Sequence, residues 1–170
     1  NEFGMLDKLN NYISSYSHGM KQKIALIGAF IHRPKLLILD EPFVGLDPKA
    51  SFVVKKMMKE FAQEYDLKIV ASTQRTVHSP KCHTFGSVIY NAMEDKYYEE
   101  EPYRNIEVID RIGSGDQYCA GVLYGLLSSD MDCQKALAYG NARSAGKNTI
   151  PGDMPSMDKE EIDNLIADHN

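Results

Sequence analysis

Residues 110–116, with the sequence DRIGSGD, place two glycines and an acid between an apolar strand pattern and an apolar helix pattern. Glycine at 113 and 115 allows backbone N–H groups to approach an anion closely. The start of the following helix adds the positive end of its dipole. Asp116, in the first helical turn, is then placed to accept a proton from a substrate hydroxyl. A tight strand-to-helix turn with an aspartate cap fits the same residues, and the motif alone favours neither interpretation.

The composition narrows the class of protein. The chain has 170 residues, 43% of them apolar, which is enough for the core of a domain of ordinary size. A net charge of −5 and the lack of a basic block disfavour nucleic-acid binding. No apolar run approaches the ~18 residues of a membrane span, and no secretory signal is visible. The three widely spaced cysteines predict a reducing, cytoplasmic setting.

One short segment combines two types of metal ligand. His78, Cys82 and His83 lie within six residues of one another. A structural metal site also needs a second set of ligands, and none follows along the chain. We therefore expect no metal site there.

Apolar periodicity predicts an α/β fold, with a mainly parallel sheet flanked by helices. Residues 36–39 and 67–71 are short apolar runs typical of buried parallel strands. Residues 49–65 between them carry apolar side chains at helical spacing, so the three segments form a right-handed βαβ unit. Further strands are expected at 84–90, 97–101 and 106–109, and helices at about 21–31, 116–128, 132–146 and 159–168.

The N-terminal part carries three motifs in the order found in the nucleotide-binding subunits of ATP-binding-cassette (ABC) transporters. It resembles that family's signature sequence, Walker B strand and D-loop, in YSHGMKQK (16–23), LLILDEP (36–42) and GLDP (45–48). The resemblance covers residues 1–62. No Gly-x-x-x-x-Gly-Lys-Ser/Thr phosphate loop occurs, and Gln74 stands where the family has a switch histidine. We therefore expect an ABC-like segment without its ATP-binding half.

Residue chemistry in this segment agrees with the resemblance. Asp40 ends an apolar strand, where a carboxylate can hold Mg²⁺ beside a phosphate, and Glu41 could polarise an attacking water. Ser17 and Gly19 precede a helix start that could contact a γ-phosphate across a dimer interface. Asp47 belongs to the D-loop. Without the flanking motifs, Asp40 and Glu41 fit a polar strand end equally well.

From about residue 62 onward, the chain resembles the C-terminal part of ribokinase-family (PfkB) carbohydrate kinases. Among them it is most similar to the 2-keto-3-deoxygluconate kinases. The matching stretches are YDLKIVASTQR (65–75), VIDRIGSGD (108–116), AGVLYGLL (120–127), ALAYGNA (136–142) and PGD (151–153).

The kinase resemblance implies phosphoryl transfer from ATP, with Mg²⁺, to a hydroxyl of a sugar acid. Asp116 would deprotonate that hydroxyl. The backbone amides of Gly113, Ser114 and Gly115 would form the anion hole for the transferring phosphoryl group.

Two further residues have nucleotide-binding roles by the same resemblance. Arg75 could reach the phosphates of ATP, and Asn141 lies on the helix that lines the adenine site in the family. A surface arginine and an ordinary polar helix residue are the competing interpretations.

Together these patterns predict a fusion, with an ABC-like segment at 1–62 and an incomplete ribokinase-like domain at 63–170. The family's N-terminal half, with its sugar-binding residues, does not precede residue 62. Open sheet edges predict self-association or a missing partner chain. An ABC transporter ATPase fragment and a non-catalytic fusion module are the alternatives to a sugar kinase.

Overall fold

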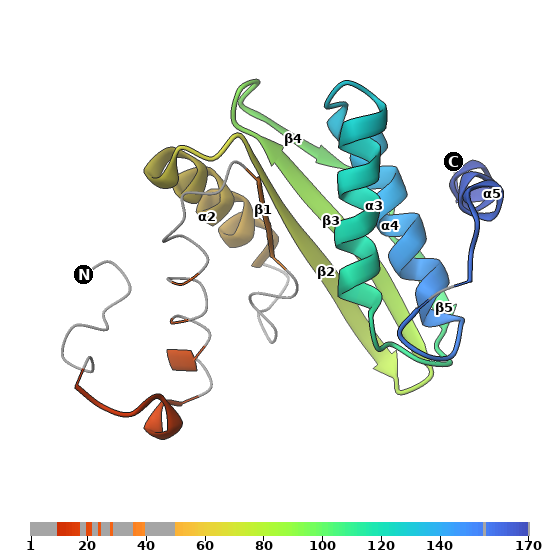
Figure 1. The fold of residues 1–170 in the computed structure, drawn as a ribbon, viewed down its shortest axis with the longest axis horizontal. Helices are drawn as coiled ribbons and strands as arrows, with labels where there is room; N and C mark the ends of the chain where they lie inside the picture. The colour runs from red at the N-terminus through yellow and green to blue at the C-terminus, as the bar shows by residue number, and fades with distance from the viewer. Residues whose placement is uncertain are drawn as a thin grey trace.

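The chain forms one mixed β-sheet with helices on both of its faces (Figure 1). The computed structural model describes residues 10–17, 20, 21, 24, 28, 36–39, 50–154 and 156–169. In chain order, the elements of this described part are η2 (Ile13–Ser15), β1 (Leu36–Leu39), α2 (Ala50–Tyr65), β2 (Ile69–Ser79), β3 (Cys82–Asn91), β4 (Lys96–Glu99), β5 (Tyr103–Glu107), α3 (Ser114–Ser128), α4 (Cys133–Asn148) and α5 (Lys159–His169).

The predicted βαβ unit is confirmed at the start of the sheet. β1 and β2 pair in parallel, with Leu36 opposite Ile69 and Leu39 opposite Ser72, and α2 connects them. The α/β class of the fold is confirmed with it. The predicted helix at 21–31 falls largely outside the described residues.

The expectation of a mainly parallel sheet is wrong. β3 pairs antiparallel with β2, and both β4 and β5 pair antiparallel with β3. Only residues 80 and 81 separate β2 from β3, which is too short for the crossover that a parallel pair needs. The chain therefore turns back on itself in a long hairpin.

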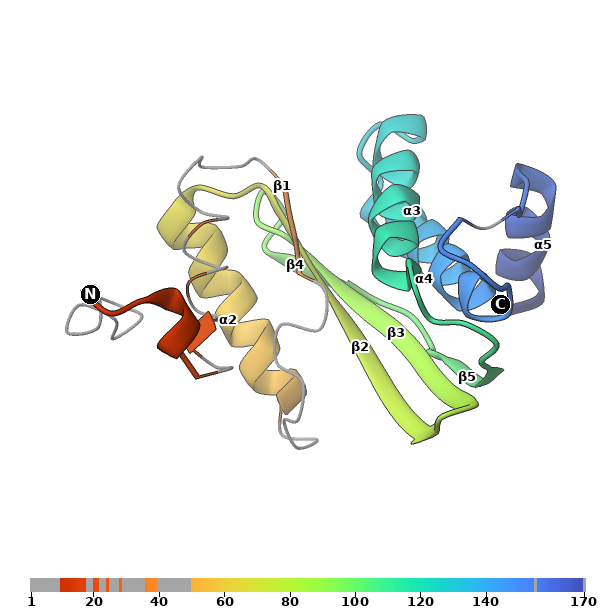
Figure 2. The ribbon, with the colours of Figure 1, turned by 60° about the horizontal axis from the view of Figure 1, so that its bottom comes forward.

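Alternation along β2 directs its side chains to two different cores. Ile69 and Ala71 pack with α3 and α4, whereas Val70 packs against α2. Figure 2 shows α2 on one side of the sheet and α3 and α4 on the other. Because Thr73 and Arg75 continue the first alternation, they share the α3 side of the sheet.

α3 and α4 form a close helix pair that carries the loop before α3. A Cβ on Gly125 would lie 2.4 Å from the Cα of Ala136, and a Cβ on Gly121 would lie 2.5 Å from the carbonyl oxygen of Tyr139. Only glycine permits this approach, so the two helices hold a fixed relative position. None of the described helices is long and apolar enough to cross a membrane.

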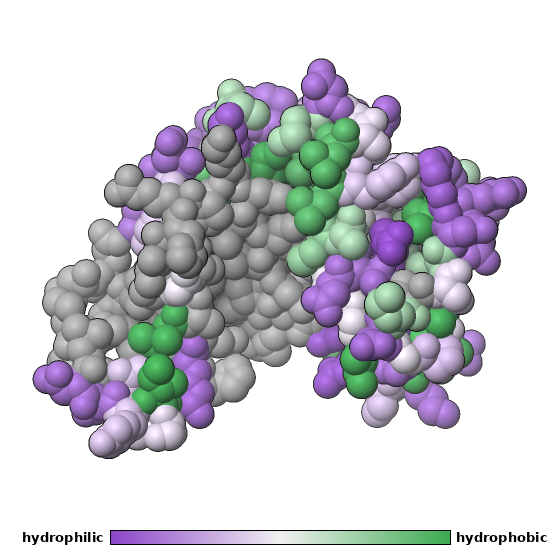
Figure 3. Space-filling model, viewed as in Figure 1, coloured by the Kyte–Doolittle hydropathy of each residue, from purple (hydrophilic) through white to green (hydrophobic). Residues whose placement is uncertain are grey.

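We predict that the chain self-associates through exposed β-edge and apolar surface. Residues 76–79 of β2 lie beyond the part that pairs with β1, and no strand in the described part pairs with their outer edge. Apolar side chains also gather on the outer face of α3 (Figure 3), where Leu123 and Leu127 are exposed. α5 packs against α4 and leaves this edge open. Sedimentation velocity should show a sedimentation coefficient that rises with protein concentration.

The Val77→Lys variant provides the control. Val77 lies on the open edge and its side chain is exposed, so a charge there should oppose pairing and leave the fold intact. A wild type that sediments as a monomer at every concentration contradicts the prediction.

Candidate functional site

The loop between β5 and α3 turns sharply at a glycine. Gly113 has φ +77° and ψ 0°, the left-handed conformation, and α3 begins at the next residue. The amide of Ser114 donates to the carbonyl of Arg111 at 3.1 Å, and the amide of Gln117 donates to the carbonyl of Gly113 at 2.9 Å. The amides of Gly115 and Asp116 have no acceptor within the described chain, as expected in a first helical turn.

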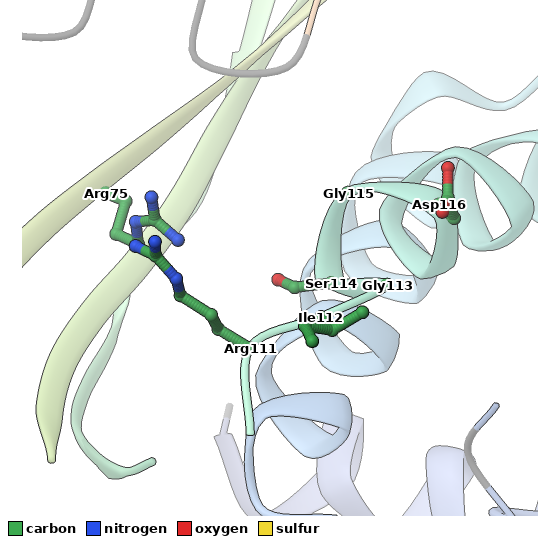
Figure 4. Close-up of a pocket in the computed structure, with 7 residues that line it drawn as sticks. All are labelled: Arg75, Arg111, Ile112, Gly113, Ser114, Gly115 and Asp116. Atoms are coloured by element: carbon green, nitrogen blue, oxygen red, sulfur yellow. The ribbon is translucent and has the colours of Figure 1, made fainter. Parts of the chain in front are cut away.

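This loop borders a cavity of about 280 Å³ (Figure 4). The cavity is lined by residues from β2, the loop and the first turn of α3: Arg75, Arg111, Ile112, Gly113, Ser114, Gly115 and Asp116. In Figure 4 the two arginine side chains extend into the same space, and Asp116 lies on α3 at the opposite side. The site therefore combines amides, guanidinium groups and one carboxylate.

The two arginines make the cavity electropositive. Their effect appears at the buried His83 on β3: burial lowers the pKa of the His83 imidazole, and the charges of Arg75 and Arg111 lower it further. His83 is therefore neutral at neutral pH. Two guanidinium groups beside helix-start amides favour an anion with several oxygens, such as a polyphosphate.

Asp110 fixes the shape of the loop. Its Oδ1 accepts from the amide of Ile112 and its Oδ2 accepts from the amide of Gly152, both at 3.0 Å. These two backbone hydrogen bonds lower the pKa of Asp110, so it is ionised at neutral pH. Its carboxylate thereby ties the loop to the segment that follows α4.

α4 supports the loop from behind. The Ser114 hydroxyl lies 2.8 Å from the Ser144 hydroxyl and accepts from Nδ2 of Asn148 at 3.2 Å. The backbone carbonyl of Asn148 accepts from the amides of Ile109 and Asp110, at 2.8 and 3.2 Å. The Ser114 side chain is thus directed into the protein, and its amide already donates to the carbonyl of Arg111. The predicted anion-hole role of the Ser114 amide would require that bond to break, whereas the Gly115 amide has no acceptor within the described chain.

The structure brings most of the kinase-like residues to one place. Arg75, Gly113, Ser114, Gly115 and Asp116 all line the cavity, although their roles in binding and catalysis remain predictions. Sequence reasoning gave no role to Arg111. Its position within the 110–116 motif could have indicated that Arg111 lies at the site.

Asn141 does not line this cavity. It is fully buried, its Oδ1 accepts from the Ser87 hydroxyl at 2.7 Å, and its Nδ2 donates to Oε1 of Glu100 at 2.7 Å. Burial raises the pKa of Glu100, and the hydrogen bond from Asn141 opposes that rise. The structure thus places Asn141 in a network between α4, β3 and the segment joining β4 to β5.

Most of the ABC-like candidates cannot be placed. Gly19, Asp40, Glu41 and Asp47 lie outside the described residues. Ser17 is described, and its hydroxyl accepts from the amide of Met20 at 3.3 Å, as at a helix start.

The short histidine and cysteine segment does not assemble a metal site in the described chain. No group of three or more His, Cys, Asp or Glu side chains gathers there or elsewhere among these residues. His78 instead lies 2.8 Å, through its Nε2, from the hydroxyl of Thr84.

Two protein families match different parts of the chain. Residues 3–81 match the family described as "AAA domain, putative AbiEii toxin, Type IV TA system", and residues 84–159 match the pfkB family carbohydrate kinases. These matches meet near the tip of the β2–β3 hairpin. The predicted boundary at residue 62 remains a prediction.

The chain is similar to ATP-binding proteins of ABC transporters. The ABC transporter ATP-binding protein NatA of Bacillus subtilis is 30% identical over 112 residues, which cover 63% of this chain and 46% of NatA. The uncharacterized ABC transporter ATP-binding protein YxlF of the same organism is 47% identical over 57 residues, covering 34% of this chain and 19% of YxlF. The chain therefore spans less than half the length of these relatives.

Solved structures of carbohydrate kinases resemble this chain over most of its length. The 2-dehydro-3-deoxygluconokinase of Thermotoga maritima has a TM-score of 0.74 at 24% identity, over 92% of this chain and 48% of that one. A putative 2-keto-3-deoxygluconate kinase of Enterococcus faecalis gives 0.68 at 24% identity, with the same coverage. These likenesses show the fold. The chain joins an ABC-ATPase-like N-terminal segment to a segment resembling PfkB carbohydrate kinases, and its overall fold is ribokinase-like.

Proposed function

We propose that this chain carries the phosphate site and catalytic base of an ATP-dependent carbohydrate kinase acting on a sugar acid. The cavity beside α3 carries the proposal, because backbone amides, Arg75, Arg111 and Asp116 line one space there. The pfkB family match to residues 84–159 and the ribokinase-like fold support it. The T. maritima and E. faecalis kinases suggest 2-keto-3-deoxygluconate as the acceptor.

Neutralisation of phosphate charge is the main task of such a site. The amides of Gly115 and Asp116 would donate to oxygens of the γ-phosphoryl group, with the helix dipole behind them. Arg75 and Arg111 would pair with phosphate oxygens from the other side of the cavity. All four donors are present before the ligand arrives, so little reorganisation accompanies transfer.

Asp116 would act as the general base. Its carboxylate is exposed in the first turn of α3, where a sugar hydroxyl can reach it. The hydroxyl proton passes to the carboxylate while the hydroxyl oxygen forms a bond to the γ-phosphorus. The bond from that phosphorus to the bridging oxygen breaks, and ADP leaves with the electron pair.

The donor set is compatible with Mg²⁺ bound together with ATP. Among the described residues that line the cavity, Asp116 is the one carboxylate. Mg²⁺ in kinases is commonly held by one or two carboxylates together with phosphate oxygens and water, and when bound it neutralises phosphate charge. Phosphate oxygens and water would therefore supply the ligands of the ion, and the Asp116 carboxylate would remain available to accept the hydroxyl proton.

Calorimetry with Mg²⁺–ATP, with and without 2-keto-3-deoxygluconate, tests the proposal. We expect the wild type to bind Mg²⁺–ATP, and Arg75→Ala to bind it about tenfold more weakly, because a charge-assisted contact is lost. Arg104→Ala is the matched control: Arg104 is exposed and pairs with Glu101 at 3.1 Å, and it does not line the cavity.

Two results would contradict the kinase assignment. One is a wild type that shows neither heat of ATP binding nor an ATP-dependent rise in melting temperature, which would favour the non-catalytic fusion. The other is Arg75→Ala binding as tightly as the wild type.

ATP hydrolysis by the N-terminal segment is the second candidate, favoured by its ABC transporter relatives. In that case Mg²⁺–ATP hydrolysis would be lost with Glu41→Gln and retained with Asp116→Asn. The kinase proposal requires the reverse pattern for phosphoryl transfer to the sugar acid.

A further inference from the structure

A lysine lies completely buried behind the phosphate loop. Lys147, in the last turn of α4, has no exposed surface, and its Nζ donates to the carbonyl of Asp110 at 3.1 Å and the carbonyl of Ile150 at 2.9 Å. In the described part of the chain, no carboxylate lies within ion-pair distance of Nζ. Burying an ammonium without a direct counter-ion is expensive, and an apolar side chain would fill the space at lower cost.

The two carbonyls belong to the two segments that shape the cavity wall. Asp110 starts the loop that leads to Gly113, and Ile150 starts the segment whose Gly152 amide donates to the Asp110 carboxylate. An ammonium bound to both carbonyls fastens the segments to each other. In a trans peptide the N–H points opposite to the C=O, so the amide of Arg111 is directed away from Lys147.

The charge of Lys147 also reduces the repulsion that the Asp110 carboxylate would exert on a bound phosphate. The Asp110 carboxylate holds the loop through two amides, but its negative charge would repel a phosphate on the other side of the same loop. The Lys147 ammonium interacts favourably with that carboxylate. It therefore offsets the negative charge behind the loop, so the amides and arginines determine the electrostatic potential in the cavity.

We propose that Lys147 is a positioning residue of the phosphate site, whose buried ammonium fixes the 110–113 loop and cancels the charge of Asp110. The inference rests on the proposed function, in which this loop binds phosphate. Lys147 does not line the cavity, so it acts through the loop rather than by touching the nucleotide. Its effect is preorganisation, which matters most where donors must be in place before the ligand arrives.

The test compares Lys147→Met with Lys135→Met by calorimetry, using inorganic phosphate and Mg²⁺–ATP as probes. Methionine keeps most of the apolar stem and removes the charge. We expect Lys147→Met to weaken binding of both probes by about tenfold or more. Lys135 is an exposed lysine in the first turn of the same helix, so its variant should bind within about twofold of the wild type.

Chemical rescue separates charge from packing. Lys147→Ala should recover binding when n-propylammonium is added, because the ion can occupy the vacated space between the two carbonyls. The neutral 1-propanol fills a similar volume and should not restore binding. Equal rescue by both compounds would overturn the charge argument.

The remaining outcomes are also decisive. A folded Lys147→Met protein with wild-type affinity overturns this inference alone and leaves the proposed function standing. A wild type that binds neither probe overturns both. If neither Lys147 variant folds, ¹⁵N NMR of the wild-type Lys147 side chain replaces them: a neutral amine, or a signal unaffected by phosphate, contradicts the inference.

Discussion

The Asp116→Asn variant is expected to bind Mg²⁺–ATP as well as the wild type does, and to transfer phosphoryl groups about 10²–10⁴-fold more slowly. An amide has nearly the shape of a carboxylate but cannot take the hydroxyl proton. Because Asp116 is exposed, the substitution should leave the fold intact. ADP release in the presence of 2-keto-3-deoxygluconate measures the transfer, and calorimetry measures ATP affinity.

Asp130→Asn is the matched control for this experiment. Asp130 is exposed, lies beyond the C-terminal end of α3 and has φ +53°, a conformation that asparagine tolerates well. Its activity should equal that of the wild type. If Asp116→Asn transfers phosphoryl groups at the wild-type rate, Asp116 is not the base. If the variant instead loses affinity for ATP, Asp116 contributes to nucleotide binding rather than to catalysis.

The local parts of the fold were predictable because they depend on neighbours in sequence. The apolar runs and the helical spacing between them predicted the β1–α2–β2 unit, which forms with parallel pairing. Asp158 and Glu161 have the spacing of a capping box at the start of the last helix. In the structure each carboxylate accepts from the other residue's backbone amide, at 2.9 Å.

Strand direction was not predictable from the same patterns. β3 is buried along almost its whole length on both faces, and its sequence mixes apolar with polar residues such as His83 and Ser87, so its residue pattern does not indicate its direction. What sets its direction is the two-residue connection after Ser79, which only a hairpin can satisfy. The antiparallel pairing therefore follows from loop length rather than from residue type.

The candidate site also has residues whose positions were predictable from the sequence and residues whose positions were not. Gly113, Gly115 and Asp116 lie within four consecutive residues, so their gathering at one cavity follows from the strand–loop–helix pattern. Lys147 is distant in sequence from the loop carbonyl that it contacts, and no local signal marks that contact. The direction of Asn141 depends on how α4 is rotated against the sheet, and this rotation places Asn141 beside Ser87 rather than in the cavity.

The Gly113→Ala variant is expected to lose about 2–5 kcal/mol of unfolding free energy, together with its affinity for ATP. At φ +77° an alanine is strained, and its Cβ would lie 2.4 Å from the carbonyl oxygen of Asp153. Because that oxygen belongs to backbone, the clash can be relieved only by moving the loop or the 150–153 segment. Urea unfolding measures the stability, and calorimetry with Mg²⁺–ATP measures the loop's function.

Gly152→Ala distinguishes the clash from the backbone strain. Gly152 has φ +83°, yet a Cβ there would meet no atom within 4 Å, and alanine keeps the amide that donates to Asp110. Its loss should therefore be about 1–2 kcal/mol, from the left-handed conformation alone. If the two variants unfold at the same urea concentration, the close contact between Gly113 and Asp153 adds nothing to the free energy of unfolding. The cavity wall would then be held by Asp110 and the end of α4, without the close packing that excludes a side chain at position 113.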